Sequence, residues 1–337
     1  MKRISNPPSS FSPETRHPLE PTPAATSDIF EETVQTILSH NDSPDLPFRW
    51  SLNPYRGCFH ACAYCYARPT HEYWGFGAGT DFESKLVVKI NAAAKLQETF
   101  RKASWNGELI VFSGNTDPYQ PLEADYRLTR ACLETCVAFR NPVGIISKSA
   151  LLTRDIDVFQ ELQKTAWVRI FLSIPFASDE MTRKVEPQAP SIAKRFATME
   201  ALAKAGIPTA ISIAPVIPGL NEQDIPKILS RAREAGAQDA TFILLRLDDQ
   251  VEQVFIERLG HQFPDRLQKI MARLKEVRQG QVGERTFFKR HHGQGTTWAV
   301  IEQLFEQSYR KLGFPTVPDS PIPATFTRPG PAQLSLF

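Results

Sequence analysis

Residues 209–246 read TAISIAPVIPGLNEQDIPKILSRAREAGAQDATFILLR and contain one complete strand–helix–strand pattern. Two runs rich in β-branched residues, 209–215 and 240–246, flank a segment at 225–235 whose apolar residues recur at three- and four-residue spacing and which ends at Gly236. Such runs are typical of strands, the spacing is typical of an amphipathic helix, and glycine commonly ends a helix. This stretch predicts a βαβ unit with parallel strands.

The same alternation occupies the middle of the chain. Four more strand-like runs lie at residues 50–55, 109–113, 143–147 and 168–174, and three more helical patterns lie at 91–102, 128–140 and 192–205. From the second strand onward the spacing is roughly 30 to 40 residues, the length of a βα unit. We predict a partial (β/α)6 barrel of the TIM type, with a doubly wound open sheet as the alternative.

Composition divides the chain into a core and two tails. Of the 337 residues, 42% are apolar and 23% charged, as in globular proteins. Eight of the 27 prolines lie in residues 1–47 and six in 315–337, where no periodic apolar face is present. We therefore predict a disordered proline-rich tail at 1–46, a core domain at 47–250, a helical extension at 251–314 and a flexible proline-rich tail at 315–337.

The net charge and the apolar runs bear on location and partners. A net charge of +2 does not by itself indicate a nucleic-acid or membrane partner. No apolar run reaches the roughly 20 residues of a membrane helix, and the N-terminus has no apolar secretory segment. We expect a cytoplasmic protein without membrane contact. Five cysteines are too few for a disulfide scaffold in a chain of this length.

Three of the five cysteines crowd into residues 56–66, RGCFHACAYCY, directly after the first predicted strand. Cys58, Cys62 and Cys65 can bring three thiolates to one soft metal centre, and an iron–sulfur cube held by three cysteines leaves one iron open. A structural zinc site needs four ligands, so it would have to recruit Cys132 or Cys136. A zinc site and three unrelated core cysteines are the alternatives.

The triplet, with an aromatic residue directly before its last cysteine, resembles the signature of the radical S-adenosylmethionine superfamily. The resemblance implies a 4Fe-4S cluster held by Cys58, Cys62 and Cys65, whose open iron binds S-adenosylmethionine. It also implies that an electron from a donor such as flavodoxin or ferredoxin cleaves S-adenosylmethionine to methionine and a 5′-deoxyadenosyl radical, which abstracts a hydrogen atom.

The resemblance extends over roughly residues 47–246 and implies contacts to S-adenosylmethionine. Asn115 or Thr116 would bind the methionine amino group, Lys148 the carboxylate, and Ser173 the ribose hydroxyls. Each lies at or just after the end of a predicted strand, where barrels place their working groups. For Lys148 the alternative is a solvated loop lysine.

Residues 216–222 resemble the superfamily motif whose backbone contacts adenine. Gly219 and Glu222 lie in this segment, and Tyr64 would stack nearby. The alternative is a plain turn at Gly219, since glycine commonly follows proline in turns.

Within the superfamily, the chain resembles the spore photoproduct lyase group at residues 53–66, 116–121 and 214–222. Lyases of that group bind DNA and abstract hydrogen from a thymine dimer, assisted by paired tyrosines and a hydrogen-returning cysteine. Tyr64 and Tyr66 match the tyrosine positions. The cysteine expected after the second strand is absent, so Cys132 or Cys136 would have to replace it.

Two further segments suggest partners. Residues 287–294, FFKRHHGQ, interleave aromatic and basic groups that could contact DNA, the alternative being an ordinary basic loop. The last five residues, Gln333, Leu334, Ser335, Leu336 and Phe337, resemble the short motif by which bacterial proteins dock on the DNA sliding clamp. The alternative is that this end packs on the chain's own core.

These observations predict a radical S-adenosylmethionine enzyme acting on damaged or modified DNA. The alternatives are radical chemistry on RNA, protein or a metabolite, and a non-catalytic adaptor that binds a metal.

Overall fold

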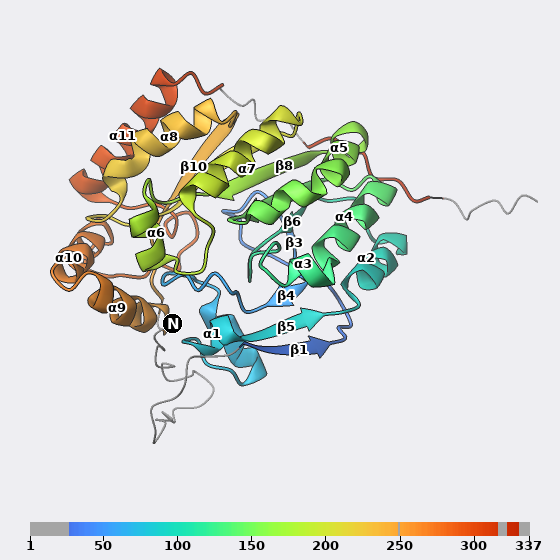
Figure 1. The fold of residues 1–337 in the computed structure, drawn as a ribbon, viewed down its shortest axis with the longest axis horizontal. Coiled ribbons are helices and arrows are strands. Elements are labelled where there is room, and N and C mark those ends of the chain that lie inside the picture. The colour runs from blue at the N-terminus through green and yellow to red at the C-terminus, as the bar shows by residue number, and fades with distance from the viewer. Residues whose placement is uncertain (1–26, 249, 316–321, 330–337) are drawn as a thin grey trace, which may run out of the picture.

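The structure is a computed structural model that describes residues 27–248, 250–315 and 322–329. At its centre is a seven-stranded sheet in the order β2-β3-β6-β7-β8-β9-β10 (Figure 1). Its strands are β2 (Leu38–His40), β3 (Trp50–Leu52), β6 (Ile110–Phe112), β7 (Val143–Ser147), β8 (Val168–Ser173), β9 (Thr209–Val216) and β10 (Asp239–Leu244).

The six strands from β3 to β10 run parallel, and only β2 pairs antiparallel, with β3. Each parallel strand lies beside the next one in chain order. A doubly wound sheet reverses its strand order at a switch point, so the sequential order excludes that alternative. The predicted partial (β/α)6 barrel is confirmed.

Helices follow the strands and lie along the outside of the curved sheet (Figure 1). They are α2 (Ala92–Arg101), α3 (Glu123–Tyr126), α4 (Leu128–Phe139), α5 (Ile156–Thr165), α6 (Asp179–Val185), α7 (Ile192–Lys204) and α8 (Ile225–Glu234). Helix α8 ends before Gly236 at φ +92°, and a Cβ there would lie 2.5 Å from the Ala203 side chain. Glycine therefore both ends this helix and lets it pack on α7.

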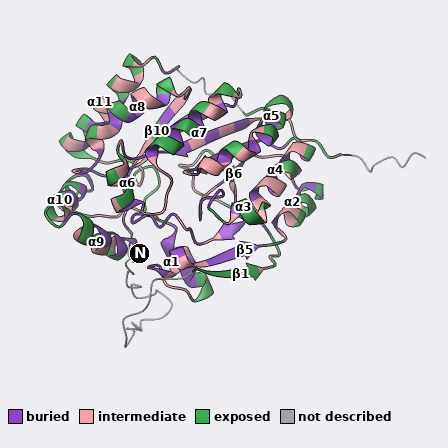
Figure 2. Ribbon diagram, viewed as in Figure 1, coloured by how far each residue is buried: buried purple, intermediate pink, exposed green. Residues whose placement is uncertain are grey.

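The core lies between the strands and the inner faces of these helices (Figure 2). Strand residues such as Leu52, Ile145 and Ile213 are fully buried. Burial on both faces of the parallel strands explains why their sequences are apolar runs without strict alternation.

A second sheet of three strands was not predicted. It contains β1 (Asp28–Glu32), β5 (Lys85–Lys89) and β4 (Tyr55–Arg56), in that order. The predicted strand at 50–55 is wrong at its end, because the chain leaves the main sheet after Leu52 and joins this one at Tyr55. The predicted disordered tail at 1–46 is also wrong where β1 and β2 form. Strand β1 depends on pairing with β5, a partner more than fifty residues away.

Beyond β10 the chain is helical, with α9 (Gln250–Gln262), α10 (Leu267–Val277) and α11 (Gly295–Lys311). Helix α1 (Asp81–Ser84) and the 3₁₀ turns η1 (Arg68–Trp74), η2 (Ala150–Asp155) and η3 (Glu222–Asp224) complete the described elements. None of the described helices is long and apolar enough to cross a membrane.

Residues 322–329, which we call the strap, dock on the barrel. The Phe326 ring lies 5.7 Å from that of Phe100 and 6.1 Å from that of Phe139. The Arg328 guanidinium donates to the carbonyls of Phe100, Lys102 and Trp105 at 2.6–3.1 Å. The predicted flexible tail at 315–337 is therefore wrong over the strap, because one aromatic and one arginine anchor a proline-rich segment. The QLSLF segment, residues 333–337, lies outside the described residues.

Candidate active site

The three clustered cysteines lie in the loop that follows β4. Cys58 and Cys62 are buried, Cys65 is partly buried, and none forms a disulfide. Burial, together with the nearby Asp117 and Cys65, raises the pKa of the Cys58 thiol to about 12. Burial also raises the pKa of Cys62, and both Cys65 and Cys58 add to the shift. Cys65 packs against the small cluster that contains Cys58, and thiols that coordinate a metal are deprotonated by it.

This donor set fits an iron–sulfur cluster. Thiolates are the ligands that such clusters prefer. Among the described residues, no three His, Cys, Asp or Glu side chains gather tightly enough for a single metal ion. A four-iron cluster attaches each cysteine to a different iron atom, so its three sulfurs do not need to meet at one point.

Two buried arginines hold the backbone of the cysteine loop through hydrogen bonds to its carbonyls. Arg68, fully buried in η1, donates to the Cys62 carbonyl through Nε at 3.1 Å and Nη2 at 2.9 Å. Arg258, from α9, donates to the Ala61 carbonyl. Glu83 accepts from both guanidinium groups. Ala61 itself has φ +58°, an unfavourable conformation that these bonds help to fix.

The loop after β6 holds the other end of the cysteine loop. Thr116 donates its hydroxyl to the Gly57 carbonyl at 2.6 Å, and Gln120 donates to the same oxygen at 3.2 Å. Gln120 also accepts from the Phe59 amide at 3.1 Å. The Thr116 hydroxyl therefore supports the loop, which leaves Asn115, partly buried beside it, as the better candidate for binding an amino group.

Tyr64 and Lys148 meet at a buried carboxylate that was not predicted. Glu186, after α6, accepts from the Tyr64 hydroxyl and from Arg195 at 2.5 Å, and the Lys148 Nζ lies 3.9 Å from it. The Lys148 Nζ also lies 5.8 Å from the centre of the Tyr64 ring. Although burial favours the neutral carboxyl, Arg195 and Lys148 hold the pKa of Glu186 below its ordinary value.

Lys148 is not a solvated loop lysine, since its side chain is only 16% exposed. Burial opposes its charge, but Cys62 and Glu186 hold its pKa above the ordinary value. Its backbone amide donates to Asp117 at 2.8 Å, and Asp117 also accepts from Ser147 at 2.7 Å. The structure thus places a fixed cation beside the cysteine loop.

Ser173, Gly219 and Glu222 lie at the ends of the next two strands. The Ser173 hydroxyl donates to the Ala214 carbonyl at 3.3 Å. Both carboxylate oxygens of Glu222 accept from the Gly219 amide at 2.9 Å. A Cβ on Gly219, at φ +87°, would lie 3.5–3.7 Å from α10. Glu222 therefore shapes the turn, and Gly219 packs against the helical extension.

Tyr66 lies on the exposed side of the cysteine loop, with 58% of its surface accessible. The Arg246 guanidinium, after β10, lies 5.9 Å from the centre of its ring and pairs with Asp248 at 3.0 Å. The two tyrosines thus have different surroundings. Tyr64 is buried beside Glu186, and Tyr66 is exposed near Arg246, after the last strand.

The expectation that Cys132 reaches the site is wrong. Cys132 is fully buried on α4, beside Cys136, Glu123 and Lys89. Helix α4 packs against α2 and α5 on the outside of the sheet. Cys132 and Cys136 therefore belong to the helical layer and complete no metal site with the loop.

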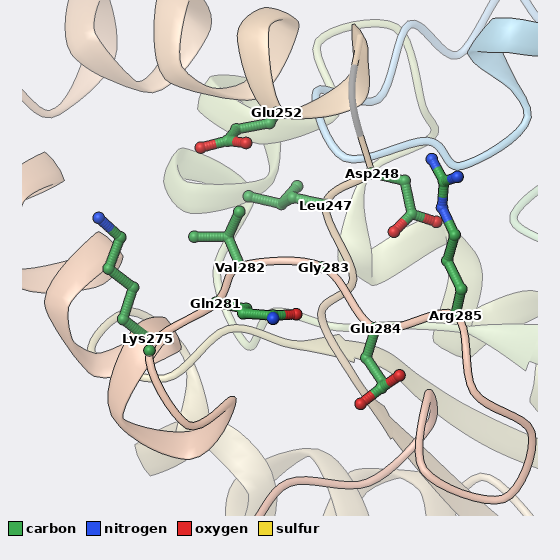
Figure 3. Close-up of a pocket in the computed structure, with 10 residues that line it drawn as sticks. Leu247, Asp248, Glu252, Lys275, Gln281, Val282, Gly283, Glu284 and Arg285 are labelled. Atoms are coloured by element: carbon green, nitrogen blue, oxygen red, sulfur yellow. The ribbon is translucent and has the colours of Figure 1, made fainter.

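A pocket of about 530 Å³ is lined by residues between 247 and 285, which follow β10 in the chain. None of the predicted site residues lines it. Figure 3 shows Lys275 on one side of it and Asp248 and Arg285 on the other. One of its lining residues, Asp248, is the partner of Arg246.

Comparisons with known proteins agree with this geometry. A family model described as the radical SAM superfamily matches residues 52–232. The Mycobacterium tuberculosis protein named "Uncharacterized protein Rv2578c" is 36% identical over 234 residues, which cover 69% of this chain and 68% of that protein. A protein of Pseudomonas phage M6 named "Radical SAM Nalpha-GlyT isomerase" is 26% identical over 217 residues, covering 63% of this chain and 43% of that protein.

Among solved structures, a spore photoproduct lyase variant with bound AdoMet and dinucleoside spore photoproduct has a similar fold. The TM-score is 0.58 at 16% identity, over 85% of this chain and 79% of that one. At this identity the similarity shows a shared fold. The family match covers more than half of the sequence and agrees with this fold. The chain therefore belongs to the radical SAM superfamily and is an enzyme whose cofactors are a 4Fe-4S cluster and S-adenosylmethionine.

Proposed function

We propose that the enzyme directs its radical chemistry at damaged or modified DNA. The observation that carries the proposal is the shared fold with a lyase solved with a dinucleoside photoproduct. The name of the phage relative does not state a DNA substrate, and its coverage is partial, so it adds only the superfamily. The lyase's own reaction is not assigned, because no cysteine of this chain takes the place of the hydrogen-returning residue.

The cysteines and Lys148 have separate roles in this proposal. Cys58, Cys62 and Cys65 would hold the cluster, and the bound cluster would supply the electron for reductive cleavage of S-adenosylmethionine. Lys148, charged and held beside Cys62, binds the methionine carboxylate. Asn115 binds the amino group.

The remaining candidates line the path away from the cysteines. Ser173, at the end of β8, would bind the ribose, and the turn from Gly219 to Glu222 would contact adenine. The buried Tyr64 limits the space beside the cysteines and keeps water away. The exposed Tyr66 faces the side from which a large substrate approaches.

The test measures 5′-deoxyadenosine release from the reconstituted, reduced protein under anaerobic conditions. We expect irradiated DNA to accelerate release relative to unirradiated DNA, RNA or no nucleic acid. Acceleration by RNA alone would replace DNA by RNA as the substrate. Retention of zinc without any release would support the adaptor alternative.

Recruitment by the DNA sliding clamp is a second part of the proposal, supported by the sequence Gln333–Phe337 alone. Deletion of these five residues leaves the strap intact and is expected to abolish binding to the clamp. Retained binding would contradict the assignment. A flavodoxin or ferredoxin is the proposed electron donor.

A further inference from the structure

Residues 286–292 cross the open side of the barrel. The Leu244 amide at the end of β10 donates to the His291 carbonyl at 3.0 Å. Arg290 makes a bidentate ion pair with Asp45, in the loop after β2. Its Nε donates to Oδ2 at 2.8 Å and its Nη2 to Oδ1 at 2.6 Å. Strands β10 and β2 are the two edges of the seven-stranded sheet. The segment therefore joins the edges that the barrel leaves apart.

Arg290 is a strut rather than a phosphate contact. Its side chain is 13% exposed and that of Asp45 is 4% exposed. The pair is thus largely withdrawn from water, and the guanidinium is already engaged by both carboxylate oxygens. The sequence-based expectation that this arginine contacts DNA is replaced by a structural role.

The strut holds Phe288 in a costly conformation. Phe288 has φ +65°, and its amide donates to Asp45 at 3.1 Å. A bulky residue rarely adopts a positive φ, and such strain concentrates at functional sites. Yet Phe288 is 65% exposed, so no burial of its ring offsets the strain. The strain is therefore offset by the bond to Asp45 and not by packing of the ring.

The surroundings of the ring favour a polyanion with flat aromatic groups. Lys289, next in the chain, is exposed and makes no ion pair among the described residues. The ring of Phe287 is 45% exposed, with the Arg290 guanidinium 5.1 Å from its centre. Asp45, which accepts from the Phe288 amide, is neutralised by Arg290.

We propose that Phe288 is a stacking platform for an unpaired base of the DNA substrate, with Lys289 contacting the adjacent phosphate. Stacking on an aromatic side chain requires an exposed ring, and the bond from the Phe288 amide to Asp45 holds the backbone that carries this one. This inference rests on the proposed function and adds to it where and how the nucleic acid is held.

The test uses the full-length, cluster-loaded protein and a fluorescent single-stranded deoxythymidine 12-mer, with affinity measured over a range of salt concentrations. Phe288→Ala is expected to weaken binding roughly 5- to 150-fold, the range for one stacked base, without changing the salt dependence. Lys289→Ala is expected to lower the slope of log affinity against log salt by about one. Phe288→Trp should retain affinity.

Two controls separate the ring from the fold. Phe30→Ala removes an exposed phenylalanine of β1, which is 43% exposed and lies outside the segment. It should leave affinity unchanged. Phe288→Gly relieves the positive φ, so it should be at least as thermally stable as the wild type and yet bind as weakly as Phe288→Ala.

The outcomes distinguish this inference from the proposed function. Equal affinity of the wild type and Phe288→Ala, with the wild type binding the 12-mer, would contradict the platform and leave the DNA substrate standing. No binding by the wild type, and no acceleration of 5′-deoxyadenosine release by DNA, would contradict both.

Discussion

Side chains outside the cysteine motif determine whether the three thiols can serve as ligands. Arg68 and Arg258 fix the carbonyls of Cys62 and Ala61, and Arg258 is 197 residues away from the carbonyl it binds. The triplet could be predicted from its spacing, because ligand spacing is local. The two arginines and Glu186 could not be predicted, since the fold alone brings them next to the loop.

The cysteines of the loop and those of α4 should respond differently to substitution. We expect Cys62→Ala to lose cluster binding and S-adenosylmethionine cleavage together, measured as iron content and 5′-deoxyadenosine. The matched control is Cys136→Ala, which removes an equally buried sulfur from the helical layer. It should keep full iron content at some cost in stability, and loss of iron in this control would contradict the assignment of ligands.

Glu186 is expected to matter for stability as well as for the site. Glu186→Gln leaves Arg195 and Lys148 buried without their anion, and breaking a buried ion network costs roughly 3–5 kcal/mol. The measurement is the free energy of unfolding in denaturant. Glu180→Gln removes an exposed acid on the neighbouring α6 that pairs with Lys184, and should cost less than about 1 kcal/mol. Equal effects of the two substitutions would contradict the role given to Glu186.

At the scale of elements, segments whose own sequence carries a strand or helix pattern were predictable, and strands that depend on a distant partner were not. Strand β7, predicted at 143–147, is found at Val143–Ser147, and α8, predicted at 225–235, ends one residue earlier. Their own side chains supply a buried face. Strands β1, β2 and β4 have five residues or fewer and exist because a partner strand lies beside them, which local sequence does not reveal.

The strap is an element whose attachment can be measured directly. The Thr327 amide donates to the Phe139 carbonyl at 2.9 Å, so it should be protected from hydrogen exchange. Phe326→Ala removes the ring that packs on Phe100 and Phe139, and partial burial of such a ring contributes about 1 kcal/mol. Exchange at Thr327 should therefore accelerate roughly five-fold. Ile322→Ala, in the same strap, serves as the control and should leave the rate unchanged.

At the scale of the whole molecule, a six-unit barrel has two free edges and must close or cover them. The Asp45–Arg290 pair spans 245 positions of the chain and connects the segments beside those edges. The barrel class was predictable from the repeating units. The closure was not, because Asp45 lies in a stretch assigned to the tail by its composition.

Breaking this closure should destabilise the molecule. Asp45→Asn leaves a nearly buried guanidinium without its anion, and we expect a loss of roughly 1–3 kcal/mol in the free energy of unfolding. Asp42→Asn changes an 89%-exposed acid in the same loop and should stay within about 0.5 kcal/mol of the wild type. An Asp45→Asn variant with the same free energy of unfolding as the wild type would show that the open side of the barrel needs no closure.

The central claim is that the radical formed in this barrel takes a hydrogen atom from DNA. It is tested most directly by incubating the reduced, cluster-loaded protein with S-adenosylmethionine and irradiated, fully deuterated DNA, and analysing the 5′-deoxyadenosine by mass spectrometry. We predict deuterium in the product, absent when protiated DNA is used. Release of 5′-deoxyadenosine without deuterium, at the rate seen without DNA, would contradict the claim.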